Sequence, residues 1–271
     1  MPELPEVETA RRGLAPMLVG RHIERVVVRQ RQLRWPVPRR LERALRGQRV
    51  EALERRAKYL LLRSVAGTAL LHLGMSGSLR VLPAETAPGP HDHVDFLLQG
   101  GTALRLRDPR RFGALLWTTG DPYHHERLRH LGPEPLGDQF DGAYLRRCLG
   151  GRRAAIKTAL MDSRLVVGVG NIYASEALFR AGVRPTTAAG SISALRCARI
   201  ASAVKQVLAE AIAAGGTTLR DFSRADGRPG YFQQELAVYG RVGEPCPSCG
   251  RAVKMLRQGQ RSTYYCAGCQ R

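Results

Sequence analysis

Several common features are missing from this chain of 271 residues. It has no run of eighteen apolar residues, which excludes a membrane-spanning helix of ordinary length. Acids stand near its start, where a secretory leader has basic residues and then an apolar segment, so no signal peptide is expected. Internal repeats and low-complexity tracts are also absent. With 44% hydrophobic residues, the chain is predicted to be globular and cytoplasmic.

Lysine is scarce although the chain is strongly basic. Lys and Arg together number 43 and Asp and Glu 23, so the formal net charge is +20. Only four of these cations are lysines: Lys58, Lys157, Lys205 and Lys254. A charge of this size favours a polyanionic partner, either nucleic acid or an anionic membrane. In so arginine-rich a chain, a lysine can mark a position that needs a compact point charge. Random drift in the sequence is the alternative explanation.

The first half of the sequence consists of strand-like runs broken by glycine and proline. Pro5 suits the first turn of a helix, and apolar residues follow it at helical spacing as far as Leu18. After Gly20, segments rich in valine and leucine predict strands at residues 22–30, 50–64, 68–74, 78–82, 93–99 and 102–108. This pattern favours an antiparallel β-sandwich or barrel.

The second half begins at a stretch of prolines and glycines, Leu131–Asp138, and then becomes helical in character. An apolar stripe from Ile200 to Ile212 ends at two glycines and predicts a long helix. A polar, glycine-containing stretch from Thr217 to Phe232 is a candidate mobile loop. We therefore expect four parts, at residues 1–131, 132–216, 217–237 and 238–271.

Four of the six cysteines form two C-x-x-C pairs near the end of the chain: Cys246, Cys249, Cys266 and Cys269. This spacing is typical of a tetrahedral structural zinc site, whose four thiolates leave no open position for chemistry. The alternative is a set of unrelated cysteines or a redox pair. Between the pairs lies a basic hairpin with its turn at Gln258–Gln260, a shape that can enter a nucleic-acid groove. Cys148 and Cys197 are expected to be buried thiols.

The opening MPELPEVET offers a reactive group. Removal of Met1 leaves Pro2 with a free secondary amine, and an α-amino group has a pKa of about 8, against about 10.4 for lysine. Such an amine can attack a sugar carbon and form an iminium, which acts as an electron sink. Glu3 and Glu6 are placed to give or take protons. The simpler interpretation is that the Pro-Glu pairs only start a helix, and Lys58 is a rival nucleophile.

The chain resembles the bacterial formamidopyrimidine-DNA glycosylase family in blocks that follow one another in the family's order: MPELPEVETARRGL, RRAKYLLL, HLGMSGSLR, HDHVD, DPRRFG, VVGVGNIYASEALF, DGRPGYF and QRSTYYCAGC. The blocks cover essentially the whole chain. PELPE resembles this branch rather than the related endonuclease VIII branch, whose chains typically start PEGPE. The resemblance implies an α+β protein with an N-terminal antiparallel β-sandwich and flanking helices, then a helix–two-turn–helix domain with a zinc-ribbon hairpin.

The resemblance also implies catalytic roles. Pro2 matches the family's nucleophile, which attacks the sugar carbon that bears the damaged base before β- and δ-elimination. Glu3 matches the acid that assists opening of the sugar, and Glu6 matches a second, supporting acid. Lys58 matches a lysine that binds phosphate beside the lesion and donates a proton in β-elimination. Arg261 matches the zinc-finger arginine that contacts phosphate and serves in δ-elimination.

Contacts with DNA follow from the same resemblance. Met75, Arg110 and Phe112 match the three residues that fill the space left by an everted base. His91 and Arg110 match DNA-contacting positions, and Asn171 matches the phosphate-binding residue of the helix–two-turn–helix motif. Further candidate DNA contacts, on a looser match, lie in a basic stretch of the same domain: Arg152, Arg153 and Lys157.

Residue types alone leave other interpretations open. Met75 and Phe112 are of types more often found in a core, and Arg110 fits a solvated turn equally well. The HDH segment that begins at His91 could bind a metal. The GVGNIY segment fits an ordinary turn between helices, with its glycines supplying backbone freedom.

Together these features predict a bifunctional DNA glycosylase and abasic-site lyase that excises 8-oxoguanine and formamidopyrimidines from duplex DNA in base excision repair. A base inside a duplex is out of reach, so the nucleotide has to turn outward, and residues 217–231 resemble the loop that closes over it. We expect one structural Zn²⁺, no organic cofactor, damaged double-stranded DNA as partner, and a monomer associated with the nucleoid rather than a membrane. Two alternatives stay open: pyrimidine-lesion specificity, as in the endonuclease VIII branch, and a catalytically silent DNA-binding protein.

Overall fold

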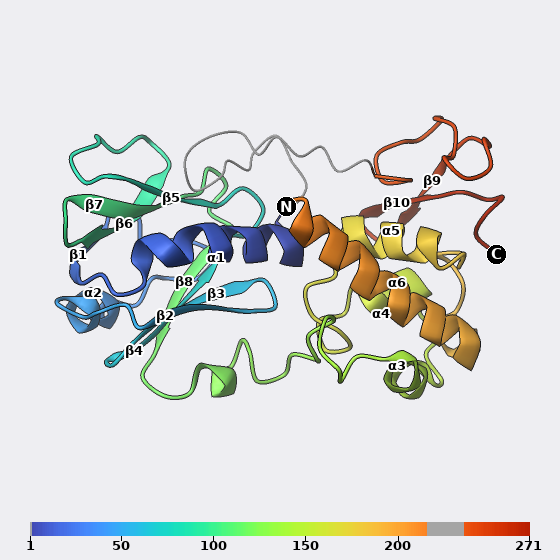
Figure 1. The fold of residues 1–271 in the computed structure, drawn as a ribbon, viewed down its shortest axis with the longest axis horizontal. Helices are drawn as coiled ribbons and strands as arrows, with labels where there is room; N and C mark the ends of the chain where they lie inside the picture. The colour runs from blue at the N-terminus through green and yellow to red at the C-terminus, as the bar shows by residue number, and fades with distance from the viewer. Residues whose placement is uncertain (1, 216–235) are drawn as a thin grey trace. The chain divides into compact units, whose positions relative to one another are not determined.

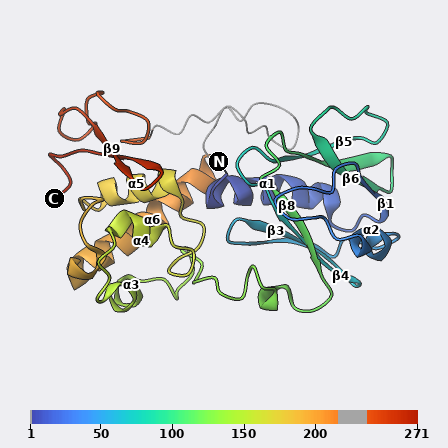
Figure 2. The same ribbon diagram turned by 180° about the vertical axis from the view of Figure 1, so that it is seen from behind.

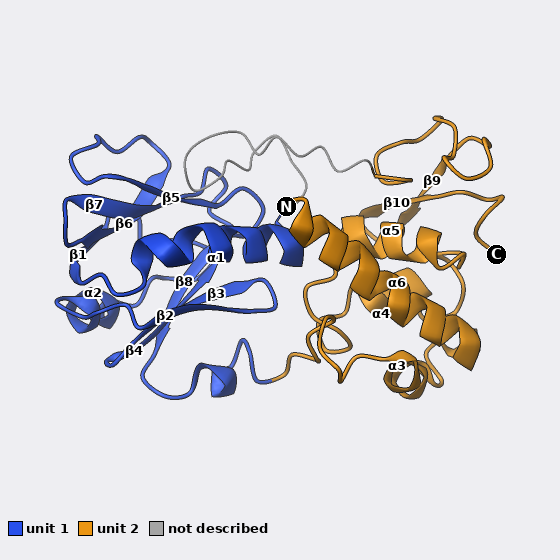
Figure 3. Cartoon of the chain, viewed as in Figure 1, with its two compact units in different colours: residues 1–129, 215–233 blue, residues 130–214, 234–271 orange. Residues whose placement is uncertain are grey.

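The computed structural model describes residues 2–215 and 236–271, which fall into two compact units (Figure 3). The first unit contains residues 2–129, and the second contains residues 130–214 and 236–271. The predicted loop at residues 217–237 lies outside the described residues except for its last two positions.

Two four-stranded antiparallel sheets form the centre of the first unit (Figures 1 and 2). In order across the first sheet, the strands are β1 (Ile23–Val28), β6 (Asp92–Leu98), β7 (Thr102–Arg107) and β5 (Ser78–Pro83). In order across the second sheet, they are β2 (Ala52–Arg56), β3 (Tyr59–Ser64), β4 (Gly67–His72) and β8 (Ala114–Thr118). Buried side chains of both sheets, such as Phe96 and Trp117, belong to one hydrophobic core. The predicted sandwich is confirmed.

Helix α1 (Leu4–Leu18) closes this core, because it contacts β2 and β3 of one sheet and β5 of the other. Its fully buried residues Leu4, Leu14 and Leu18 recur on one face at helical spacing. Two short helices complete the unit, α2 (Arg40–Leu45) beside β1 and the 3₁₀ helix η1 (Pro122–His124).

The sequence analysis treated residues 50–64 as one strand-like run, but the structure divides it into the hairpin β2–β3. The break falls at Ala57, whose φ of 55° lies in the left-handed region that residues other than glycine seldom adopt. Neither glycine nor proline marks this turn, so turn composition gave no signal. The division matters for function because Lys58 follows directly in the turn.

The second unit is helical, as expected. It contains α3 (Gly142–Leu149), α4 (Ile156–Leu160), α5 (Asn171–Arg180), α6 (Ala194–Ala213) and the 3₁₀ helix η2 (Ala189–Ser191). The long helix α6 packs against both α3 and α5, and the stripe from Ile200 to Ile212 is its buried face. Among the described helices, none is long and apolar enough to cross a membrane.

A short hairpin, β9 (Lys254–Gln258) and β10 (Arg261–Tyr265), ends the second unit and contacts α5 through β10. Its turn at Gly259–Gln260 agrees with the predicted position. Of the two cysteines outside the C-x-x-C pairs, Cys197 is buried as expected. The expectation was wrong for Cys148, which is only half-buried.

Candidate catalytic and nucleic-acid-binding sites

Two buried acids follow Pro2 at the start of the first unit. Pro2 directly precedes α1, at the positive end of the helix dipole. Glu3 and Glu6 are each 1% exposed. Glu6 Oε2 accepts a hydrogen bond from Glu3 N at 2.8 Å, one half of a capping box between the two residues. The capping that starts the helix therefore also fixes two carboxyl groups next to Pro2.

Glu8, two residues after Glu6 in α1, anchors the helix through charge. Its carboxylate accepts hydrogen bonds from Arg11, Arg12 and Arg55 at 2.9 to 3.1 Å. Burial alone would raise the pKa of Glu8, but the hydrogen bonds from Arg11 and Arg12 and the charges of Arg11 and Arg55 lower it to about 2. Glu8 is thus ionised at any physiological pH and ties α1 to strand β2.

Arg55 extends this link to the turn that carries Lys58. While its Nε donates to Glu8, its Nη1 donates to the carbonyl oxygen of Ala57 at 3.1 Å. The left-handed conformation of Ala57 sharpens the turn, so Lys58 leaves it in a fixed direction. The helix that begins next to Pro2 and the turn of Lys58 are therefore held together by one guanidinium.

His72, at the end of β4, belongs to this group although the sequence analysis missed it. Its ring lies 4.8 Å from the ring of Tyr59, and its Nδ1 accepts a hydrogen bond from Gly74 N at 2.9 Å. Burial and then the charges of Lys58 and Arg34 lower the pKa of His72 to about 4. A neutral imidazole results at pH 7, close enough to Lys58 to respond to its charge. The available signal was the HLG segment next to Met75, which was read as a strand end.

The three predicted space-filling residues lie on two neighbouring loops of the first unit. Phe112 is 44% exposed, which excludes a core position for it, and Met75 is half-buried. The guanidinium carbon of Arg110 lies 4.7 Å from the centroid of the Phe112 ring, a cation–π contact. Ser76 Oγ accepts a hydrogen bond from Arg110 N at 3.2 Å, which joins the loop of Met75 to the loop of Arg110.

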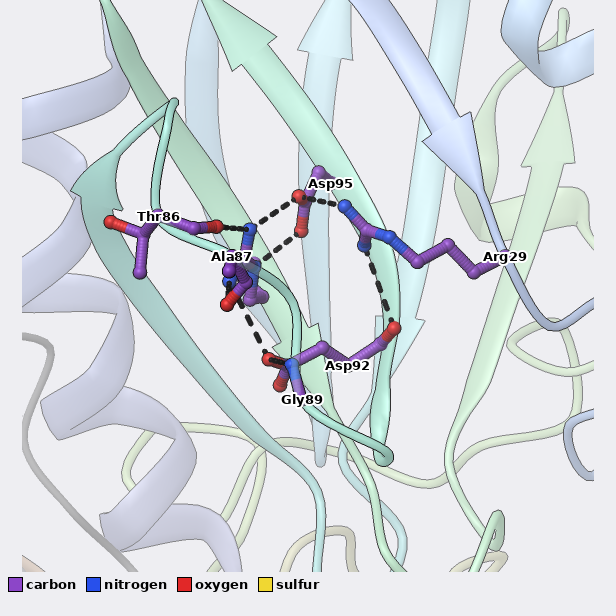
Figure 4. Close-up of polar contacts among 7 residues, drawn as sticks. Arg29, Thr86, Ala87, Gly89, Asp92 and Asp95 are labelled. Atoms are coloured by element: carbon purple, nitrogen blue, oxygen red, sulfur yellow. Dashed lines mark hydrogen bonds and ion pairs between the residues drawn. The ribbon is translucent and has the colours of Figure 1, made fainter.

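The segment before His91 is held by a buried ion-pair network (Figure 4). Asp95 accepts hydrogen bonds from Arg105 and Arg29, and Arg105 also donates to the carbonyl oxygens of Thr86 and Ala87. Burial would raise the pKa of the Asp95 carboxyl, but the hydrogen bonds from the two arginines lower it below its usual value. The network fixes the chain between β5 and β6, at whose end His91 stands.

The alternative of a metal site at His91 finds no support within residues 2–215 and 236–271. His93 Nε2 lies 2.8 Å from the carbonyl oxygen of Asp108, and Asp92 Oδ2 accepts a hydrogen bond from Gly89 N. The group of potential metal ligands that these residues do bring together is the four cysteines of the second unit.

Asn171 is the centre of a polar cluster in the second unit. It is the first residue of α5, after Gly168 with a φ of 79°. Its Oδ1 accepts a hydrogen bond from Lys157 Nζ at 2.5 Å, and its Nδ2 donates to Ser262 O at 3.0 Å and to Tyr239 Oη at 3.4 Å. Tyr239, which the sequence analysis did not single out, is therefore a member of this cluster.

Glu176, one turn further along α5, fixes the position of Tyr239. Its carboxylate accepts hydrogen bonds from three consecutive backbone N–H groups, those of Ala237, Val238 and Tyr239, at 2.8 to 3.0 Å. Three such donors make a strong anchor for the segment that leads into the hairpin. A lone glutamate within a helix gives no sequence signal for this role.

Lys157 does not lie on the surface, as a direct DNA contact would require. It is 1% exposed, and its ammonium donates to Asn171 Oδ1, Ser262 O and Thr263 Oγ1. These bonds use its three protons on protein oxygens and connect α4, α5 and β10. The basic stretch before it differs: Arg153 is exposed, and Arg152 is half-buried with an ion pair to Asp162 at 3.3 Å.

The four C-x-x-C cysteines converge at the base of the hairpin. Their sulfur atoms all lie within 4.8 Å of one another. The hydrogen bond with Cys249, then burial and the contacts with Cys246 and Cys266, raise the pKa of Cys269 to about 12. Four cysteine sulfur atoms this close together are the donor set of a structural zinc site, and one Zn²⁺ fits here. The metal orients the hairpin, on which Arg261 is exposed.

Comparison with known proteins agrees with this arrangement. Family models match three segments: the formamidopyrimidine-DNA glycosylase N-terminal domain at residues 1–115, the H2TH domain of the same enzymes at residues 131–223, and the zinc finger found in FPG and IleRS at residues 243–271. Formamidopyrimidine-DNA glycosylases of Halorhodospira halophila and Alkalilimnicola ehrlichii are 62% and 61% identical, and each alignment covers the whole of both chains.

Solved structures give the same result. The MutM (Fpg) protein of Thermus thermophilus has 41% sequence identity and a TM-score of 0.88, with 99% of this chain and 98% of that chain covered. Lactococcus lactis Fpg in complex with DNA that contains an abasic site has 31% identity and a TM-score of 0.92, with 99% of each chain covered. With three family models and full-length relatives in agreement, this chain belongs to the formamidopyrimidine-DNA glycosylase family.

Proposed function

We propose that the chain is a bifunctional DNA glycosylase and abasic-site lyase that removes 8-oxoguanine and formamidopyrimidines from duplex DNA during base excision repair. The observation that carries the proposal is Pro2 at the start of α1, with the buried Glu3 and Glu6 beside it. Membership of the family and the abasic-site and Fapy-dG DNA bound by the L. lactis relative support the choice of substrate.

The reaction begins at the secondary amine of Pro2 after removal of Met1. An α-amino group has a pKa of about 8, so part of it is a neutral nitrogen at neutral pH. The nitrogen attacks C1′ of the deoxyribose, and the bond to the damaged base breaks as the base leaves with its electron pair and gains a proton. Opening of the sugar ring, assisted by Glu3 with Glu6 in support, gives an iminium.

Strand cleavage follows by two eliminations. Water or a neighbouring carboxylate takes a proton from C2′, and the electrons of the C2′–H bond move towards the iminium to give an enamine. The enamine electrons then form the C2′–C3′ double bond, restore the iminium and expel the 3′ phosphate. Lys58, bound to the neighbouring phosphate, acts as proton donor in this elimination. A second elimination expels the 5′ phosphate with the help of Arg261. Both residues are cations with access to solvent, as phosphate binding requires.

The DNA duplex is held by residues of both units. Met75, Arg110 and Phe112 fill the space of the everted nucleotide, and His91 contacts the backbone. The phosphate-binding residues of the second unit are Asn171, Arg152 and Arg153. Lys157, buried beneath Asn171, takes a supporting role rather than a direct one. The enzyme acts as a monomer in the cytoplasm, bound to the nucleoid, with residues 217–237 as its lesion-recognition segment.

The test is covalent trapping with borohydride, which reduces an iminium to a stable protein–DNA adduct. Pro2→Glu keeps Met1 in place and converts the reactive nitrogen into an amide, so trapping is abolished while duplex binding persists. Pro5→Ala changes another proline of the same helix and is the matched control, in which trapping continues. An adduct of undiminished yield in Pro2→Glu would overturn the proposal.

Lys58→Met separates the two candidate nucleophiles. With Pro2 as nucleophile the variant still forms the adduct, but strand cleavage slows by about 100-fold or more, the usual size of a general acid's contribution. Loss of the adduct itself would assign the attack to Lys58. Excision from paired duplexes that carry 8-oxoguanine or an oxidised pyrimidine then decides the lesion class.

A further inference from the structure

One buried aspartate in the first unit contacts, through its side chain or its backbone, each of the loops that carry the proposed DNA-reading residues. Asp108 follows β7 and is fully buried. Its Oδ1 accepts a hydrogen bond from Ser76 Oγ at 2.8 Å, in the loop of Met75. Its Oδ2 accepts one from Gly113 N at 2.7 Å, directly after Phe112. Each carboxylate oxygen therefore holds a different loop.

The backbone of Asp108 reaches a third segment. Its N–H donates to the carbonyl oxygen of His91 at 3.0 Å, and its own carbonyl oxygen lies 2.8 Å from His93 Nε2. The same carbonyl accepts a hydrogen bond from the N–H of Arg111 at 3.2 Å. Arg111 has a φ of 54°, a conformation that a non-glycine residue keeps only when its surroundings hold it.

The two loops bound by the carboxylate also touch through their backbones. A Cβ atom on Gly74 would lie 2.4 Å from the carbonyl carbon of Phe112, and one on Gly113 would lie 2.8 Å from the carbonyl oxygen of His72. Only glycine permits such an approach. Met75 and Phe112 therefore project from two loops that cannot move apart without breaking hydrogen bonds to Asp108.

We propose that Asp108 is the positioning residue of the DNA-reading loops, and that the hydroxyl of Ser76 transmits this positioning between Met75 and Arg110. The hydroxyl donates to Asp108 Oδ1 and accepts from Arg110 N, so one atom belongs to both loops. The inference rests on the proposed function, in which these side chains enter the duplex. Because Met75, Arg110 and Phe112 are already held in place before DNA binds, they lose little conformational entropy when they displace a nucleotide. This lowers the free-energy cost of turning the nucleotide out of the duplex.

Ser76→Ala removes this bridging hydroxyl and leaves Asp108 in place. The readout is the fluorescence of 2-aminopurine beside an uncleavable abasic analogue in duplex DNA, because this base brightens when it is unstacked. The wild-type protein raises the signal on binding, and Ser76→Ala weakens this opening equilibrium by about tenfold, the effect of one or two lost hydrogen bonds. Ser76→Thr keeps the hydroxyl and restores the signal. Asp108→Asn also weakens the signal, because an amide has one acceptor oxygen where the carboxylate uses two.

Trapping on duplex and on single-stranded abasic DNA gives the second readout, since a single strand needs no wedge. Ser76→Ala lowers the duplex rate by about tenfold and leaves the single-strand rate within about twofold of wild type. Ser64→Ala is the matched control, because it removes a hydroxyl that bonds Gly67 O in another turn of the same unit. Equal losses on both DNAs, or no change in the opening signal, would overturn the inference. Absence of trapping in the wild-type protein, with the opening signals as expected, would overturn the proposed chemistry alone.

Discussion

The two units organise their sites around buried charges of opposite sign. In the first unit Asp108 accepts hydrogen bonds from a hydroxyl and a backbone N–H. In the second unit Lys157 donates to a carbonyl, a hydroxyl and an amide oxygen. The charge of each buried group matches the polar groups around it. Donors of tight loops face Asp108 in the first unit, and oxygens of a helix start and a hairpin face Lys157 in the second.

The units differ more in how they are stabilised. The sandwich has a large core drawn from both sheets, whereas the cluster beneath the hairpin consists of Val238, Val253, Cys246 and Cys266. So small a core does not hold a hairpin without further help. The first unit therefore depends on burial and the second, at its hairpin, on metal. Both tryptophans, Trp35 and Trp117, lie in the first unit, so their fluorescence reports that unit alone.

Loss of zinc has the largest expected effect. Cys266→Ser removes one thiolate ligand, and structural zinc contributes about 10–16 kcal/mol of apparent binding free energy in small zinc modules. We expect the variant to lose its zinc, measured as metal per protein chain, and to lose duplex binding, measured by mobility shift. The tryptophan-detected unfolding transition stays where it is in the wild-type protein.

Cys148→Ser is the control for this experiment, because Cys148 is a thiol of the same unit outside the metal group. It keeps both zinc and DNA binding. Intact DNA binding by a metal-free Cys266→Ser protein would show that the hairpin does not need the metal. The two units would then not differ in depending on burial and on zinc.

Removal of the buried ammonium ranks second. Lys157→Met fills a similar volume but removes the donor to Asn171 Oδ1 and Thr263 Oγ1, and each orphaned acceptor costs about 1–3 kcal/mol, whereas Ser262 O keeps its hydrogen bond from Asn171 Nδ2. Unfolding followed by far-ultraviolet circular dichroism, which the helical second unit dominates, shifts to lower denaturant. Tryptophan fluorescence does not shift. A matched loss in both signals would mean that the two units unfold as one, which contradicts their separate stabilisation.

Much of the fold could be predicted because its signals are local. The strands of the sandwich alternate or run apolar, α6 carries a stripe at helical spacing, and the C-x-x-C pairs specify their metal by spacing alone. Strand β8 was missed because four of its five residues are buried, on both faces, and show no alternation. The turn at Ala57 was missed because it lacks the residues that usually mark turns.

The candidate site was predictable only where residue type decides the chemistry. Pro2, Lys58 and the cysteines are identified by what they can do. Lys157 is a candidate DNA contact only through the looser match of its basic stretch, and nothing local in the sequence indicates that its ammonium is buried. Asp108 and Glu176 act through contacts with segments distant in sequence, which no pattern within one segment can reveal.

The smallest expected effect concerns pH and tests the first unit by itself. The fold lowers the pKa of His72 to about 4, while the unfolded chain takes up this proton near the ordinary value of 6.5. Between these values the unfolded state binds more protons, so the free energy of unfolding falls as the pH falls from 6.5 towards 4. At pH 5 the loss is at most about 2 kcal/mol, since each unit of pKa difference corresponds to about 1.4 kcal/mol.

His72→Asn isolates this contribution, because an amide oxygen can still accept the hydrogen bond from Gly74 N but does not titrate. Urea unfolding followed by tryptophan fluorescence at pH 7.5 and pH 5 compares the two proteins, and other titrating groups such as Glu8 cancel in the difference. The wild-type protein loses more stability on acidification than the variant. If both proteins lost the same stability, His72 would bind its proton equally well in the folded state and in the unfolded chain. Its burial and the charges of Lys58 and Arg34 would then not lower its pKa.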